Sequence, residues 1–163
     1  MPGTLGSPLE GRNSTGAADL AEPPTDPSRI VERAIEIKTY DIDFAGIVGN
    51  IVYVRWLEDL RLAMMAEVYP LAQAVADDVA PVLLETRIAY ERPLTLQNRV
   101  VGRIWAAGMT GARWRIGAAF RVGEIVHARA EQTGLFIRLS TRKPVPPPKI
   151  LVEHFARERG GAA

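Results

Sequence analysis

The sequence predicts a single α+β domain in which an antiparallel sheet wraps around one long helix. The hydrophobic pattern is strand-like once, then helical, then strand-like four more times. The last four strand-like segments are joined by short connections, which favour antiparallel pairing. A length of 163 residues, 47% of them hydrophobic, fits one domain with one core. We therefore expect a five-stranded antiparallel sheet with the helix on one of its faces.

The first 28 residues have the composition of a disordered segment. Residues 1–28 contain five of the twelve prolines and four of the fourteen glycines, with acidic residues between them. These acidic residues argue against an organelle transit peptide. We expect a disordered leader at 1–28, a folded domain at 29–150, and a C-terminal tail at 151–163 that is partly helical or disordered.

The first strand and the long helix follow the leader. Alternation of apolar and polar residues starts at Val31 and predicts a strand that ends near Tyr40. Apolar residues then recur at helical spacing from about Asn50 to Val68, and Pro70 ends the helix. Asn50 is the expected N-cap, and the preceding Gly49 would let the chain turn into the helix.

The remaining strands form a meander. A short helix over residues 71–77 leads through Pro81 into the sheet, and Gly108 to Gly111 form a hairpin-like turn. Prolines after residue 143 are expected to prevent further strand pairing. The four predicted strands span residues 82–92, 99–107, 112–122 and 125–139.

Charge and composition exclude several classes of function. The formal net charge of +1 gives no general attraction to nucleic acid or to an anionic membrane surface. The chain has no cysteine and only two histidines, His127 and His154, so we expect no metal site, no thiol nucleophile and no histidine-based triad. No apolar run approaches the roughly 20 residues that span a bilayer, and a signal peptide pattern is missing. We expect a cytoplasmic protein without a membrane partner.

Two separated motifs resemble those of a known family. The first is Asp43-Phe-Ala-Gly46-Ile-Val, followed by Tyr53 and by Arg-Trp-Leu-Glu at 55–58. The second is Tyr-Glu-Arg-Pro-Leu at 90–94, and a proline-rich exit follows at 143–146. Over residues 30–148 the chain resembles the hot-dog fold acyl-CoA thioesterases, especially the 4-hydroxybenzoyl-CoA thioesterase type.

This resemblance implies a fold and a function. The hot-dog fold has the same order of strand, helix and four strands that the hydrophobic pattern predicts. The resemblance implies a thioester hydrolase without a cofactor that cleaves an acyl-CoA or an acyl-carrier-protein thioester. It also implies a homodimer or homotetramer with active sites at the subunit boundary. A thioesterase for carrier-protein-bound chains and a non-catalytic acyl-thioester-binding protein are the alternatives.

Asp43 is the predicted catalytic residue. Thioester hydrolysis needs a nucleophile, or a base that activates water, and a group that stabilises the negative charge on the carbonyl oxygen. An aspartate carboxylate can serve in the first role, and free backbone N–H groups at a helix start can serve in the second. The resemblance places Asp43 at the catalytic position and the oxyanion-binding N–H groups at Gly49 and Asn50. The alternative is that Asp43 only caps the loop or the helix.

The loop lacks the histidine that many relatives carry. Ile47 and Ile51 stand where a histidine would be expected. This difference disfavours a hydratase or dehydratase of the same fold and leaves a mechanism that uses only a carboxylate. Together with Val48, the two isoleucines would line an apolar pocket for the acyl group.

Other candidate residues have structural alternatives. Glu58 is a second possible acid, although a solvated ion pair with Arg55 or Arg61 is the competing interpretation. Asp41 points away from Asp43 in an extended chain and is expected to be structural. Tyr53 and Trp56 share the apolar stripe of the helix and are expected in the core.

CoA carries phosphates, which arginine and lysine bind. Arg142 and Lys143 match a basic position after the last strand of the family, and Arg92 is a further candidate. The alternative for each of them is a solubilising surface cation.

Overall fold

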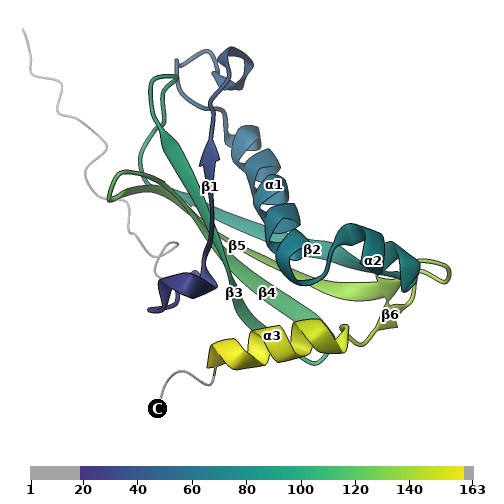
Figure 1. The fold of residues 1–163 in the computed structure, drawn as a ribbon. Coiled ribbons are helices and arrows are strands. Elements are labelled where there is room, and N and C mark those ends of the chain that lie inside the picture. Colours follow the sequence, from purple (N-terminus) through teal and green to yellow (C-terminus); the bar gives the residue numbers. More distant parts are fainter. Residues whose placement is uncertain (1–18, 160–163) are drawn as a thin grey trace, which may run out of the picture.

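The computed structural model describes residues 19–159 and has the predicted α+β architecture (Figure 1). The sheet has the strand order β1-β3-β4-β5-β2, every neighbouring pair is antiparallel, and β6 pairs with β5. The expected hot-dog fold is confirmed. Its elements are β1 (Val31–Ile35), α1 (Asn50–Val68), α2 (Leu71–Ala76), β2 (Val79–Tyr90), β3 (Val100–Thr110), β4 (Arg113–Val122), β5 (Ile125–Arg138), β6 (Pro144–Val145) and α3 (Lys149–Arg159), with short 3-10 helices η2 (Pro27–Arg29) and η3 (Thr39–Asp41).

The core lies between α1 and the concave face of the sheet. The bounds of α1 are those predicted, and its apolar stripe is buried against the strands. The rings of Tyr53 and Trp56 lie 5.4 and 5.6 Å from the ring of Phe120 on β4. Both residues therefore belong to the core, as expected from their helical spacing.

The first strand is shorter than predicted. It ends at Ile35 rather than near Tyr40, and a 3-10 turn follows at Thr39–Asp41. The carboxylate of Asp41 accepts a hydrogen bond of 2.8 Å from the backbone N–H of Lys38. This local bond closes a turn where the strand would otherwise continue. The strand therefore ends before the alternating sequence pattern does.

The strand boundaries also differ around glycine and proline. Pro81 lies inside β2, which an edge strand tolerates because half of its N–H groups need no partner. Strand β3 continues through a bulge between Ala106 and Gly108, so the hairpin turn falls at residues 111–112 instead of 108–111.

The proline-rich exit forms one more strand. We expected its prolines to prevent pairing, and this was wrong for β6, in which Pro144 and Val145 pair with Ile137 and Phe136. Proline has no N–H to donate to a neighbouring strand, but it is tolerated as the first residue of a strand, which is where Pro144 lies in β6. The chain then forms α3, whose Leu151 and Phe155 are buried in the core.

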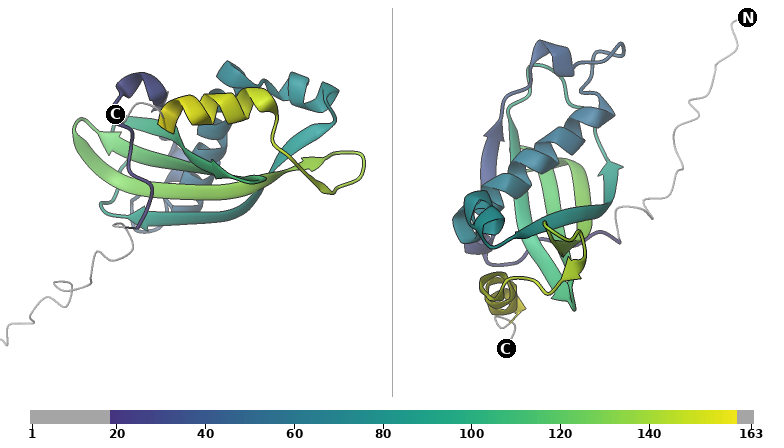
Figure 2. Two further views of the ribbon diagram at one scale, coloured as in Figure 1. Left: turned by 90° about the horizontal axis from the view of Figure 1, so that it is seen from below. Right: turned by 90° about the vertical axis from the view of Figure 1, so that its right-hand side faces the viewer.

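Residues 19–21 lie on the face of the sheet opposite α1, and the chain then runs to η2 and β1 (Figure 2). Leu20 is 7% exposed, the backbone N–H of Ala21 donates 2.9 Å to the carboxylate of Glu131 on β5, and Asp19 pairs with Arg87 on β2. We expected a disordered leader at 1–28. Residues 1–18 lie outside the described residues, whereas the segment from 19 onward is held by the sheet, so there the expectation was wrong.

Candidate active site

The loop between η3 and α1 presents Asp43 to solvent. The Asp43 carboxylate accepts a hydrogen bond of 2.8 Å from the N–H of Ala45, its own N–H donates 2.8 Å to the carbonyl of Ile47, and its carbonyl accepts 3.0 Å from Gly46. Gly46 has a φ of +75°, which favours glycine. These bonds make a compact turn with an exposed carboxylate immediately before α1.

The first turn of α1 has an available backbone donor at Asn50. Gly49 is the N-cap, and its N–H already donates 2.9 Å to the carbonyl of Asp41. This bond contradicts the predicted oxyanion role of the Gly49 N–H. Within residues 19–159, the N–H of Asn50 has no acceptor, as expected at a helix start. Asn50 is the first helical residue rather than the predicted N-cap.

Asp41 has a structural role beside this site. It is 6% exposed, its carboxylate accepts from Lys38, and its carbonyl accepts from Gly49. A buried carboxylate with these local bonds fixes the loop, as we expected of the first of the two acids.

The second motif packs directly against the first. The hydroxyl of Tyr90 donates 3.1 Å to the carbonyl of Asn50, and the N–H of Val48 donates 2.8 Å to the carbonyl of Leu94. The rings of Tyr90 and Tyr53 lie 5.1 Å apart, edge to face. Burial raises the pKa of Tyr90, so its hydroxyl stays protonated at neutral pH and can donate. Sequence reasoning missed Tyr90 as a site residue, although it starts the second motif.

A protein-family model matches the part of the chain that contains both motifs. The family model of the thioesterase-like superfamily matches residues 37–155, which include both motifs and every strand from β2 to β6. The chain belongs to the thioesterase-like superfamily.

Solved structures share the fold of this thioesterase-like domain. It is similar to a DHNA-CoA thioesterase from Staphylococcus aureus, with a TM-score of 0.73 and 14% identity over 80% of this chain and 91% of that one. A 1,4-dihydroxy-2-naphthoyl-CoA thioesterase from Synechocystis has a TM-score of 0.70 and 18% identity over 78% and 96%. A hypothetical protein from Staphylococcus aureus, solved in complex with CoA, has a TM-score of 0.74 and 13% identity over 79% and 83%. No curated protein sequence matches significantly.

The predicted acyl-pocket residues lie in different surroundings in the thioesterase-like domain. Val48 is 2% exposed and packs in the core, so in the single chain it has almost no surface to offer an acyl group. Ile51 is 63% exposed at the start of α1, and Ile47 is half-buried in the loop. Of the three predicted residues, the two isoleucines are therefore the ones with exposed surface near Asp43.

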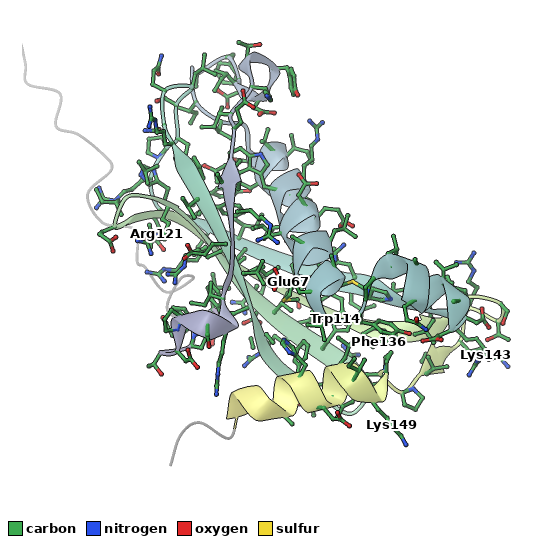
Figure 3. All side chains as sticks on the ribbon, in the orientation of Figure 1. Glu67, Trp114, Arg121, Phe136, Lys143 and Lys149 are labelled. Atoms are coloured by element: carbon green, nitrogen blue, oxygen red, sulfur yellow. The ribbon has the colours of Figure 1, made fainter. Side chains whose placement is uncertain are left out.

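The predicted CoA-binding cations fall into two groups. Arg92 follows β2, beside the motif that packs on the Asp43 loop, and its backbone N–H donates 3.0 Å to His127. Arg142 and Lys143 lie in the turn after β5, next to the start of β2 and at the other end of the sheet (Figure 3). Helix α1, which runs between these two ends, is about 28 Å long for its 19 residues. One chain therefore does not bring all three cations together.

Glu58 forms the ion pair that we expected as its structural alternative. Its carboxylate contacts the guanidinium of Arg61, which also donates 3.0 Å to the side-chain oxygen of Gln132 on β5. Glu58 is half-exposed, whereas Gln132 is 2% exposed. The pair ties α1 to the sheet, and Glu58 is occupied by a cation rather than placed beside Asp43.

Residues 19–159 contain neither a cluster of metal ligands nor a membrane-spanning helix. No group of three or more histidine, aspartate or glutamate side chains lies close enough together to hold a metal ion. No helix in this part of the chain is both long and apolar enough to cross a membrane.

Proposed function

We propose that this protein is an acyl-CoA thioesterase that hydrolyses an acyl thioester to a free acid and CoA. The observation that carries this proposal is the exposed carboxylate of Asp43 immediately before a helix whose first N–H, that of Asn50, has no acceptor in the described part of the chain. Membership of the thioesterase-like superfamily and the CoA thioesterases among the structural neighbours support the same activity.

The residues supply the two functions that hydrolysis needs. As a general base, Asp43 takes a proton from water, whose oxygen attacks the acyl carbon. The N–H of Asn50, at the positive end of the helix dipole, donates to the carbonyl oxygen as it becomes negative. The carbon–sulfur bond then breaks, and the CoA thiolate takes the proton from Asp43. In the alternative nucleophilic route, the Asp43 carboxylate attacks the acyl carbon, the carbon–sulfur bond breaks and CoA leaves as a thiolate. Water then hydrolyses the resulting anhydride to the free acid and the Asp43 carboxylate, and the proton released goes to the CoA thiolate.

The Tyr90 hydroxyl supports the oxyanion site indirectly. It donates to the carbonyl of Asn50, on the residue that offers the N–H. This bond holds the first turn of α1 against the end of β2, so Tyr90 is a positioning residue in the proposal.

A homodimer would gather the cations around Asp43. Strand β2 is an edge of the sheet in the described residues, with Leu83 and Leu84 37% and 49% exposed, and such an edge favours pairing with a second copy. An isologous antiparallel pair of β2 strands sets the start of one strand beside the end of the other. Arg142 and Lys143 lie at the start of β2, and Arg92 lies at its end. The dimer therefore gives each site Arg92 from one chain and the other two cations from its partner.

The test is a thiol-release assay with Asp43 variants. The purified protein should release CoA from a panel of acyl-CoA thioesters. Asp43→Ala should lose at least about 100-fold in kcat/KM, because the neighbouring carboxylate of Asp41 is buried and accepts from Lys38. Asp59→Ala, which removes an exposed acid further along the helix, is the matched control and should keep its activity. Circular dichroism should show both variants folded. Full activity of Asp43→Ala would disprove the mechanism.

Two alternatives are separated by the same assay. A thioesterase for carrier-protein-bound chains would cleave an acyl-carrier-protein thioester far faster than the CoA thioester of the same acyl group. A non-catalytic binding protein would bind acyl-CoA in calorimetry without releasing CoA. The Asp43 carboxylate is exposed to solvent, and this exposure favours hydrolysis over binding alone.

A further inference from the structure

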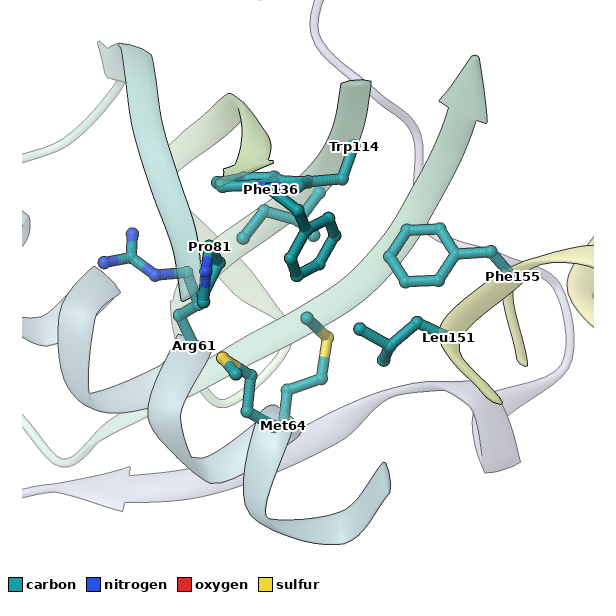
Figure 4. A pocket seen from close by; sticks show the side chains of 9 residues that line it. Arg61, Met64, Pro81, Trp114, Phe136, Leu151 and Phe155 are labelled. Atoms are coloured by element: carbon teal, nitrogen blue, oxygen red, sulfur yellow. The ribbon is translucent and has the colours of Figure 1, made fainter. Parts of the chain in front are cut away.

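A cavity lies between the C-terminal half of α1, the sheet and α3 (Figure 4). Its volume is about 40 Å³, which is room for the short end of a hydrocarbon chain, and the cavity is partly open to solvent. We call it the α3 cavity. Its lining residues are Arg61, Met64 and Met65 of α1, Pro81 of β2, Trp114 and Ile116 of β4, Phe136 of β5, and Leu151 and Phe155 of α3.

The chemistry of the α3 cavity suits a hydrocarbon. Its exposed lining is apolar, and the guanidinium of Arg61 is engaged by Glu58 and Gln132, which leaves the aliphatic stem of Arg61 for the cavity. Met64 and Met65 have flexible side chains that adapt to ligands of different shape. A charged or strongly polar group would lose its hydration there without gaining a partner.

The α3 cavity reaches the edge of the sheet at which a second copy would pair. Pro81 lies near the start of β2, and Leu151 and Phe155 lie on the side of α3. In the isologous antiparallel pair of β2 strands, the start of β2 lies beside the end of the partner's β2. Tyr90 at that end is bonded to Asn50, so the start of the partner's α1 comes next to the cavity.

We propose that the α3 cavity binds the distal hydrocarbon end of the acyl group whose thioester is cleaved by Asp43 of the partner subunit. The proposal rests on the proposed thioesterase function and assigns its substrate class: acyl groups with a long apolar tail. The roof of the cavity comes from Leu151 and Phe155, which lie after the last strand. Helix α3 is therefore the element that sets the preferred acyl length.

A filling variant tests the cavity. Leu151→Trp adds bulk at a 6% exposed position of the lining, so it should lower kcat/KM for octanoyl-CoA at least about 10-fold and for acetyl-CoA less than about 2-fold. Ile150→Trp is the matched control, because Ile150 lies on the same helix but is 51% exposed. Phe155→Ala removes bulk and should shift the preference toward longer chains. Equal loss for octanoyl-CoA and acetyl-CoA in a folded Leu151→Trp would overturn the proposal.

Mixed dimers test the sharing between subunits. Asp43→Ala and Leu151→Trp chains are co-expressed with different affinity tags, and the mixed dimer is isolated. If the cavity of one chain serves Asp43 of the other, one of the two sites is intact, so octanoyl-CoA activity should be about half that of the parent. If both features belonged to one chain, both sites would be defective, and low activity in the mixed dimer would disprove the sharing.

Failure of the proposed function is distinguishable from failure of this inference. If the parent binds acyl-CoA without hydrolysis, calorimetry replaces the rate assay. Affinity should then rise from acetyl-CoA to octanoyl-CoA, and Leu151→Trp should remove that rise. In that case the proposed binding role of the α3 cavity would be supported, although the proposed hydrolysis would not. An affinity independent of chain length would refute the cavity whether or not the protein is an enzyme.

Discussion

Gly46 is the residue of the Asp43 loop whose backbone conformation a side chain would strain. Its φ is +75°, and a Cβ atom there would meet nothing within 4 Å, so the cost of replacing it lies in the backbone alone. Gly49, which we expected to provide the freedom for the turn, has an ordinary φ of −66°. Sequence identified the loop and its acid, but only the structure shows which glycine shapes it.

Replacing Gly46 should lower stability by an amount that depends on the left-handed conformation. Gly46→Ala should cost about 1 kcal/mol in the free energy of unfolding, because a Cβ disfavours a positive φ. Gly46→Asn should cost less, since asparagine tolerates this region better. Urea denaturation of the parent and the two variants measures both effects, and an equal loss in the two would argue against backbone strain as the cause.

At the scale of elements, the features set by neighbouring residues could be predicted from the sequence, whereas those set by contacts between distant residues could not. Helix α1 was predictable because the helical spacing of its apolar residues and the glycine and proline at its ends are local features of the sequence. The end of β1 was not, because the Asp41 side chain competes for the backbone. Tyr90 was missed as a site residue because its bond to Asn50 joins positions 40 apart. Strand β6 depends on its partner β5 rather than on its own sequence.

A pH-dependent contact joins the turn before β2 to the end of β5. Asp78 has a φ of +57°, and its carboxylate accepts from the backbone N–H and the hydroxyl of Ser140, at 2.9 and 2.5 Å. The hydroxyl bond first, and the N–H bond and Arg138 with it, lower the pKa of Asp78. A lowered pKa means that this contact stabilises the fold above the pKa of the unfolded state, near 4, and is lost as the pH falls through the folded-state pKa.

Asp78→Asn should therefore destabilise the protein modestly at neutral pH, since asparagine keeps the backbone conformation but lacks the charge. The difference in melting temperature from the parent should shrink as the pH falls below about 4. Thermal unfolding followed by circular dichroism between neutral and acidic pH measures it. A constant difference at every pH would mean that the carboxylate charge has no part in the contact.

At the scale of the whole molecule, one chain does not bring the three predicted CoA-binding cations together. Motif resemblance found Arg92, Arg142 and Lys143, but one chain separates them along the sheet. No pattern in a sequence states which edge strand will pair, because that depends on which backbone groups the folded chain leaves open. The edge at β2 is the structural feature that would unite the cations with Asp43.

Charges on the β2 edge should disrupt the proposed dimer. Leu83→Lys combined with Leu84→Lys brings two cations from each chain, four in all, to the proposed β2–β2 contact, so light scattering should report a monomer. The activity should fall when the dimer is lost, because each site then lacks Arg142 and Lys143 of the partner subunit. Ile125→Lys is the control, because it changes a comparably exposed residue at the β4–β5 turn. It should leave the oligomeric state and the activity unchanged. A double variant that remains dimeric would place the subunit contact elsewhere.

The segment at residues 19–30 has a consequence for larger assemblies. It occupies the outer face of the sheet through Leu20 and Ala21, and Trp105 on that face is 2% exposed. Two dimers that stacked their sheets back to back would have to peel this segment away and leave the Glu131 carboxylate without its backbone donor. The chain thus covers part of the outer face of its own sheet, so a partner that bound there would have to displace this segment first.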